Sequence, residues 1–313
     1  MNKLSIKVFC LIPWLCMLMV GCQKEGVYQP EKKLSKIHIT TDYLQRDMTW
    51  HWNGNLLKSI IVNSTDSYGS VRGDNYEFEY QGQRVKNIIC TDISGYDPAI
   101  YYHFHYNGRH LSYIEGVQDT NNEDFPQRPC AKYTFTHNDH NQITEIQVER
   151  YGEKKSENDP LTEILPMILP GISLKDAERI HQSQTEMPAP KEFDKRVITL
   201  AYEGDNVKEY RVDCGSMEYV YQYQYMDYLN PMYHFFSGGY TELIMPTFSY
   251  SRNLPSSADI QYNRVWAGSV ENIGNYHNEY HYQLDEDGYI TESQYTGIDY
   301  DEIVVTSRYE YVK

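Results

Sequence analysis

The chain has 313 residues, with 44 acidic against 28 basic side chains and a formal net charge of −16. That charge excludes nucleic acid as a partner, because nucleic-acid binding depends on Lys and Arg against phosphate, and it also excludes anionic lipid headgroups. Tyrosine is abundant, with 31 residues against nine Phe and four Trp. Because tyrosine favours half-buried pleated surfaces, this composition predicts extensive β-sheet.

The first 21 residues have the pattern of an export signal. Lys3 and Lys7 precede an apolar run over 8–20 that is too short to span a bilayer. The run ends in Leu-Met-Val-Gly before Cys22, which resembles the lipobox of bacterial lipoproteins. The resemblance implies cleavage after Gly21, a diacylglyceryl thioether on Cys22 and an acyl chain on the new amino terminus.

Residues 22–44 are expected to form a lipidated N-terminus and a tether. Several acyl groups anchor a protein stably, so we expect membrane contact through the lipid only. The segment Gln23-Lys24-Glu25 is similar to the tag that directs Bacteroidetes-type lipoproteins to the cell surface. We therefore expect an outer-membrane lipoprotein and favour surface display over the periplasmic leaflet. Cleavage removes two lysines, which changes the net charge to −18.

Four of the six cysteines are in the mature chain, since Cys10 and Cys16 lie in the signal. Cys22 is the lipidation site, which leaves Cys90, Cys130 and Cys214. An odd number without close spacing predicts no metal framework. Two alternatives remain open: one disulfide with one thiol left over, or three free and buried cysteines.

Residues 45–313 contain a repeated β-hairpin pattern and are interpreted as a single domain. Each unit has alternating aromatic or apolar residues, a short polar turn and then apolar residues three apart. In chain order the turns follow Trp52, Tyr80, Tyr106, His137, Tyr202 and Leu284, and a seventh first strand carries Tyr219, Tyr221, Tyr223 and Tyr225. Residues two apart share a face of a strand, and the Gly or Asn residues supply the positive φ of tight hairpin turns.

Seven units predict an all-β fold of about 14 strands in an antiparallel meander. A sheet of that size must curl or close, so we expect a strongly curved sheet or a partial barrel. One insert, residues 155–192, breaks the pattern with five prolines. A capping-box pattern at 173–176 predicts one small helix there, either as a cap over the apolar end of the sheet or as a lid over a ligand cavity.

The units resemble YD-type, RHS-like hairpin repeats. As a whole, residues 45–313 resemble a Bacteroidetes lipoprotein family of unknown function described as having a porin-like fold. The Tyr-x-Phe-x-Tyr strands, the Gly turns, the 230–233 segment Asn-Pro-Met-Tyr and the closing Asp287-Gly288-Tyr289 carry this resemblance. It implies a curved sheet or partial barrel and no known activity. The faces opposite the aromatics are polar, for example Glu77 and Glu79, so we expect no membrane-inserted barrel.

The aromatic faces are the candidate ligand-binding residues. They are Tyr76, Phe78, Tyr80, Tyr102, Phe104, Tyr106, Tyr219, Tyr221, Tyr223 and Tyr225. One interpretation is that they form the packed core through cross-strand pairs. The other is a concave aromatic wall that stacks on sugars or another amphipathic ligand, because tyrosine has an apolar body and a polar tip.

Metal and catalytic motifs are weak. His103 and His105 share one strand face, as do His277, Glu279 and His281, but neither set fixes a complete ligand sphere. The acidic segments 285–288 and 299–302 are explained by turn chemistry without calcium. No Gly-x-Ser-x-Gly motif, reactive cysteine or phosphate-binding loop occurs. We therefore predict no catalytic residue, no metal and no cofactor apart from the lipid on Cys22.

The sequence-based hypothesis is a lipid-anchored, non-enzymatic binding or scaffold module for a glycan or an envelope protein. Two alternatives remain. An envelope glycan hydrolase would use paired carboxylates about 5–10 Å apart in a pocket. A purely structural lipoprotein would have no ligand, and its aromatic faces would serve folding alone.

Overall fold

The computed structural model describes residues 25–28, 30–41, 44–95, 98–120, 126–151, 194–230, 233, 250–266, 268–298 and 304–312. The expected lipidation site, the helical insert 155–192 and the acidic segment 299–302 lie outside these residues. Within the described ranges, no helix is long and apolar enough to cross a membrane.

Sixteen β-strands form the regular structure of the described ranges. They are β1 (Leu34–Thr40), β2 (Leu44–Asn53), β3 (Leu56–Asp66), β4 (Val71–Gln81), β5 (Arg84–Asp92), β6 (Ile100–Asn107), β7 (His110–Asp119), β8 (Gln127–His137), β9 (Ile143–Arg150), β10 (Asp194–Glu203), β11 (Asn206–Asp213), β12 (Met217–Leu229), β13 (Asn253–Trp266), β14 (Ser269–Leu284), β15 (Ile290–Ile298) and β16 (Val304–Tyr311).

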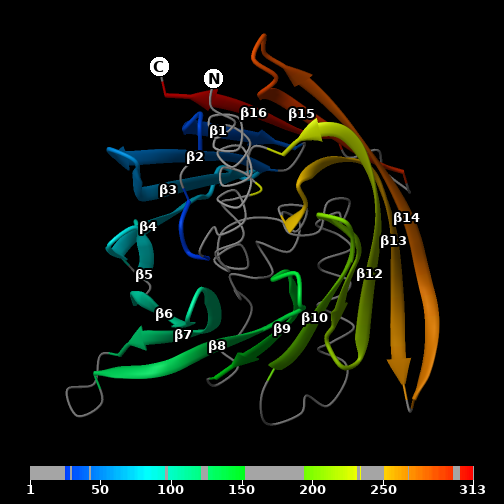
Figure 1. Ribbon diagram of the computed structural model, residues 1–313, viewed down its shortest axis with the longest axis horizontal. Helices are drawn as coiled ribbons and strands as arrows, with labels where there is room; N and C mark the ends of the chain where they lie inside the picture. The colour runs from blue at the N-terminus through cyan, green and yellow to red at the C-terminus, as the bar shows by residue number, and fades with distance from the viewer. Residues whose placement is uncertain are drawn as a thin grey trace, which may run out of the picture.

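The strands follow one another around a closed antiparallel barrel in chain order, and β16 pairs with β1 (Figure 1). Six hairpins have the same irregularity: the register shifts just before the last inward-facing residue of the first strand. These residues are Trp52, Tyr80, Tyr106, His137, Tyr202 and Leu284. A shift of this kind is a β-bulge, which leads the strand into a turn such as that of Gly82, with φ of +66°.

The barrel has two distinct ends. Because the six short hairpins alternate regularly with the other connections, all their turns lie at one end, which we call the turn end. Residues 67–70, 93–95, 120, 214–216 and 268, which belong to the connections between these hairpins, lie at the opposite end, the far end. Adjacent antiparallel strands run in opposite directions, so this arrangement follows from the topology alone.

The inner wall of the barrel is apolar and buried. Strand β4 shows the rule: Tyr76 and Phe78 are each 7% exposed, whereas the alternating Glu77 and Glu79 are exposed on the outer wall. Cross-strand ion pairs decorate the outer wall, for example Arg211 with Glu218 at 2.6 Å. Polar side chains outside and apolar side chains inside are the reverse of a barrel that spans a bilayer around a water-filled channel.

The structure differs from the sequence prediction in closure and in strand number. The six hairpins and β12 occur where the repeats place them, but the sheet is a complete barrel rather than a partial one, and it has sixteen strands rather than about 14. The additional strands are β1, which lies in the segment 22–44 interpreted as a tether, and β16. Neither belongs to a hairpin repeat; β1 pairs with β2 and β16 pairs with β15, and the pairing of β1 with β16 closes the barrel.

Candidate functional site

The predicted ligand-binding aromatics lie on the inner wall. Tyr219, Tyr221 and Tyr223 are between 0% and 6% exposed, and Phe104 is 6% exposed. Tyr80, Tyr102, Tyr106 and Tyr225 are partly buried and pack against the same apolar cluster. Their burial matches the packed-core interpretation of these faces.

The last aromatic of several repeats joins its hairpin to the preceding one. The Tyr80 hydroxyl donates to the Leu57 carbonyl oxygen at 2.7 Å, and the Tyr106 hydroxyl donates to the Val85 carbonyl oxygen at 2.7 Å. The same type of bond is made by Trp52 to Leu34, Tyr225 to Val207, Tyr282 to Pro255 and Tyr311 to Ile290. These bonds account for tyrosine at Tyr80 and Tyr106, since the Phe78 and Phe104 side chains in the middle of the same strands have no donor.

Residues 25–28 and 30–33 lie at the turn end and are held there by several hairpins. The Glu25 amide donates to the Arg109 carbonyl oxygen at 3.1 Å, and the Val85 amide donates to the Gly26 carbonyl oxygen at 2.9 Å. The guanidinium of Arg84 donates to the Glu25 carbonyl oxygen at 2.8 Å and lies over the Tyr106 ring. The segment expected to be a tether is therefore docked on the barrel from Glu25 onwards.

The other end of this segment is fixed by lysines. Lys32 Nζ lies 2.5 Å from Asp285 Oδ2, in the β14–β15 turn, and Lys33 Nζ donates to the Gly54 carbonyl oxygen at 2.8 Å. The ammonium of Lys32 donates a hydrogen bond to Asp285 and thereby lowers the pKa of that carboxyl group. The acidic segment 285–288, which the sequence analysis attributes to turn chemistry, is thus a hairpin turn whose Asp285 pairs with a lysine.

Glu25 places a buried carboxylate between two histidines. Its Oε1 lies 2.8 Å from His137 Nε2 and 3.7 Å from His110 Nδ1, and its Oε2 accepts a hydrogen bond from the Leu111 amide. The Glu25 side chain is 9% exposed and that of His137 is 13% exposed. We call Glu25, His110 and His137 the rim cluster. Among the described residues, it is the one group of three that brings potential metal-ligand atoms within 4.8 Å of one another.

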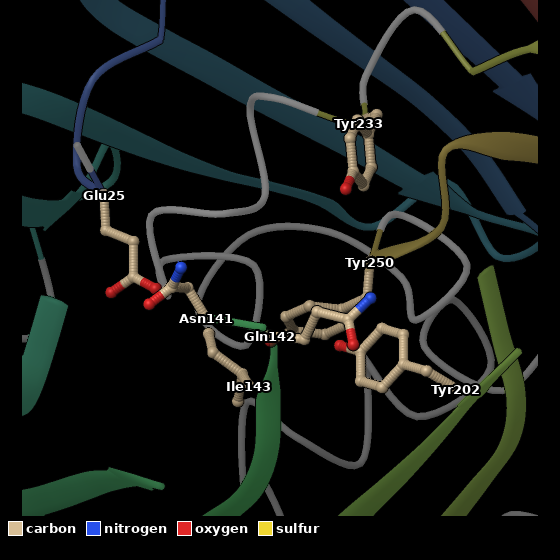
Figure 2. A pocket seen from close by; sticks show the side chains of 7 residues that line it. All are labelled: Glu25, Asn141, Gln142, Ile143, Tyr202, Tyr233 and Tyr250. Carbon is tan, nitrogen blue, oxygen red and sulfur yellow. The ribbon is translucent and has the colours of Figure 1, made fainter. Parts of the chain in front are cut away.

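A small pocket of about 60 Å³ adjoins the rim cluster. It is lined by Glu25, Asn141, Gln142, Ile143, Tyr202, Tyr233 and Tyr250. Figure 2 shows the Glu25 carboxylate pointing towards Asn141, with Tyr202 and Tyr250 on the other side of Gln142. One water needs about 10–15 Å³ of such space, so the pocket has room for water.

The histidines singled out by the sequence do not gather in the same way. His103 Nδ1 pairs with Asn87 Oδ1 at 2.9 Å, and His105 stacks on Tyr113 near Glu115. On the outer wall, His277 lies 2.6 Å from Asp259 and 3.9 Å from Glu279, and His281 lies 4.0 Å from the same glutamate. Hydrogen bonds and ion pairs account for both sets.

Cys90, Cys130 and Cys214 are free thiols. This decides between the two alternatives that the sequence left open. All three are partly buried and pack against the apolar inner wall. Burial raises the pKa of the Cys90 thiol to about 12 and that of Cys130 to about 11. Such thiols are protonated at neutral pH and are poor nucleophiles.

These features define a closed sixteen-stranded β-barrel with an apolar inner wall. No protein-family model and no curated protein matches the chain. A porin-like protein from Bacteroides uniformis has a similar structure, with a TM-score of 0.51 at 12% identity over 93% of this chain and 100% of that chain. A porin-like protein from Bacteroides vulgatus aligns with a TM-score of 0.32 at 10% identity over 90% of this chain and 99% of that chain. The first likeness shows that the fold is porin-like.

The rim cluster was not predicted from the sequence. Its members come from three distant segments, and Glu25 was interpreted only as part of a surface-export tag. One sequence signal was present, however. His137 occupies the repeat position held by Trp52, Tyr80, Tyr106 and Tyr202 in other hairpins, as the matching bulges show.

Proposed function

We propose that the chain is a lipoprotein of the bacterial outer membrane, anchored through lipids on Cys22 and displayed at the cell surface, whose barrel is a non-enzymatic binding or scaffold module. Its partner is a glycan or another envelope protein. Three features support the proposal: the lipobox-like sequence, the polar outer wall of the barrel and the position of the docked N-terminal segment.

The docking of Glu25 at the turn end is the observation that carries the proposal. Glu25, whose amide donates to the Arg109 carbonyl oxygen, lies three residue steps after Cys22. Three extended residues span roughly 10 Å, so a lipid on Cys22 would hold the turn end within about that distance of the membrane. The far end then points away from the membrane, towards partners.

The outer wall supports anchoring rather than insertion. Glu77, Glu79, Gln222 and Gln224 are exposed on the wall, at heights where a spanning barrel would have apolar side chains. A charged residue on the lipid-facing side of a barrel costs about 2–4 kcal/mol at the bilayer midplane. A lipid anchor avoids this cost because the barrel stays in water.

The far end carries exposed apolar side chains suited to a partner. Tyr68 is 92% exposed and Trp266 is 64% exposed, and Val71, Ile93 and Val270 are also exposed at this end. Exposed aromatic side chains are typical of binding surfaces, where Tyr and Trp contribute much of the affinity. The aromatic inner wall, by contrast, is buried.

Two substitutions test the orientation and the binding surface. Cys22→Ala should release the protein from the outer-membrane fraction, and the unchanged protein should be cut by protease added to intact cells. Trp266→Ala with Tyr68→Ala should abolish binding on a glycan array or cross-linking to an envelope protein. Tyr228→Ala is the matched control, because Tyr228 is 50% exposed at the turn end. Retention of Cys22→Ala in the membrane, or equal loss with Tyr228→Ala, would contradict the proposal.

The glycan-hydrolase alternative has less support from the described pockets. The pocket beside the rim cluster has a single carboxylate, Glu25, in its lining. A second pocket on the outer wall is lined by His38, Thr40, Gln294, Thr306 and Arg308, with no carboxylate. Glycoside hydrolysis by the usual route needs two carboxyl groups across one site. Release of reducing sugar from envelope glycans by the purified protein would favour the hydrolase.

A further inference from the structure

We propose that the rim cluster is a binding site for a divalent transition metal, with Zn²⁺ as the expected ion. Its ligands are Glu25 Oε1, His110 Nδ1 and His137 Nε2. The inference does not rest on the proposed function, because the site is built from the barrel and its docked N-terminal segment alone.

The site lies at a hairpin in which one repeat position is histidine instead of tyrosine. In the β4–β5 and β6–β7 hairpins, the Tyr80 and Tyr106 hydroxyls donate to carbonyl oxygens of the preceding hairpin. The acceptors are Leu57 and Val85. At the next hairpin the equivalent residue is His137, and the Glu25 carboxylate lies between it and the Leu111 amide. A tyrosine at position 137 would serve the barrel as well, so the histidine and the buried carboxylate call for another explanation.

Glu25 and His137 are at hydrogen-bond distance, whereas Glu25 and His110 are too far apart for a hydrogen bond and close to the spacing of two ligands on one metal ion. Ligands about 2.1 Å from a tetrahedral Zn²⁺ are roughly 3.4 Å from each other. The carboxylate oxygen lies 2.8 Å from one histidine nitrogen and 3.7 Å from the other, on either side of that separation. His110 Nδ1 is buried and has no hydrogen-bond partner among the described residues, and it faces the carboxylate.

The donor set and its surroundings are those of a zinc-type site. Two imidazoles and one carboxylate suit Zn²⁺, whereas Ca²⁺ and Mg²⁺ require more oxygen ligands. Three protein ligands leave a fourth position for water, and the adjoining pocket beside Glu25 has room for it. The Leu111 amide holds the second carboxylate oxygen and so orients the ligand.

The neighbouring arginine favours the histidine tautomer opposite to the one that metal binding requires. Arg109 Nε donates to His110 Nε2 at 3.3 Å, which places the imidazole proton on Nδ1 when no metal is bound. Binding moves this proton to Nε2, and Arg109 then keeps its other bond, to Asn141 Oδ1 at 2.9 Å. The metal joins residue 25 to the β6–β7 and β8–β9 hairpins, so it fastens the N-terminal segment to the barrel.

Metal titration of the full chain tests the site. The protein, purified in detergent without a polyhistidine tag and stripped with a chelator, should bind one Zn²⁺ by calorimetry. Co²⁺ in its place should give the visible absorption of a tetrahedral site. Glu25→Gln, which preserves the shape and the Leu111 bond, should weaken Zn²⁺ binding at least about tenfold. His110→Ala should do the same, and the rise in the thermal midpoint on adding Zn²⁺ should be lost in both.

His277→Ala is the matched control, because this outer-wall histidine also lies beside two carboxylates. It should leave Zn²⁺ affinity unchanged. The variants' thermal midpoints in chelator separate loss of a ligand from loss of folding, and Glu25→Gln remains informative if His110→Ala fails to fold. The proposal is overturned if the wild-type chain binds no stoichiometric Zn²⁺, or if Glu25→Gln and His110→Ala bind it as tightly as wild type.

Discussion

Removing a single hydroxyl group should have opposite effects at two tyrosines of the inner wall. Tyr80 donates to the Leu57 carbonyl oxygen and connects the β4–β5 hairpin to the β2–β3 hairpin. Tyr221 is 0% exposed, and its hydroxyl has no hydrogen-bond partner among the described residues. The substitutions Tyr80→Phe and Tyr221→Phe remove the same atom from these two environments.

The expected magnitudes follow from the state of each hydroxyl. A typical internal hydrogen bond stabilises a protein by about 1 kcal/mol, so Tyr80→Phe should lower the free energy of unfolding by about that amount. A buried polar group without a partner costs about 1–3 kcal/mol, so Tyr221→Phe should raise the free energy of unfolding by about 1 kcal/mol. In a domain of this size, 1 kcal/mol corresponds to about 2 °C in the thermal midpoint.

Equilibrium urea unfolding followed by tyrosine fluorescence and circular dichroism measures both changes. Tyr106→Phe serves as a second donor control, since its hydroxyl bonds the Val85 carbonyl oxygen. If Tyr221→Phe destabilises the barrel as much as Tyr80→Phe does, then the Tyr221 hydroxyl has a favourable interaction. The expected difference between a hydroxyl that bonds a neighbouring hairpin and one without a partner would then be absent, and the proposed role of the Tyr80 bond would be contradicted.

Two further predictions concern ionisable groups. Burial raises the pKa of the Cys90 thiol to about 12, so at pH 8 it should react with an alkylating reagent about 10³ times more slowly in the folded protein than in urea. Peptide mass spectrometry measures both rates, and equal rates would contradict the burial of Cys90. The Lys32 ammonium lowers the pKa of the Asp285 carboxyl group in the folded protein. The pair should therefore stabilise the folded state at pH values above the ordinary aspartate pKa of about 3.9, and this stabilisation should be lost as the pH falls through the lowered pKa of Asp285. Lys32→Met should therefore reduce stability at pH 7 and not at pH 2, and an equal loss at both would refute the role of charge.

The hairpins could be predicted from the sequence because their determinants are local. Alternation such as Tyr76-x-Phe78-x-Tyr80 specifies a strand with one apolar face, and the turn at Gly82 has the positive φ that favours glycine. Each unit carries both signals within about ten residues. The exposed positions of Glu77 and Glu79 follow from the same alternation, so the polar outer wall was predictable as well.

Closure of the barrel was not predictable in the same way. Strand β1 lacks the aromatic alternation, and besides β2 it pairs with β16 at the other end of the chain. Pairing between residues almost 300 positions apart leaves no periodic trace in one sequence. The segment before β1 was therefore interpreted as a tether, although Glu25 and Lys32 are docked on the turn end.

By itself, the sequence determined the local order of this protein: the repeated hairpins, the apolar and polar faces of each strand, and the lipobox-like segment from which we infer export. Backbone geometry and side-chain alternation decide these features within a few residues. Only the tertiary structure decided that the sheet closes and that Glu25 meets His110 and His137. The physical reason is that closure and the rim cluster depend on the curvature of the whole sheet, to which all sixteen strands contribute.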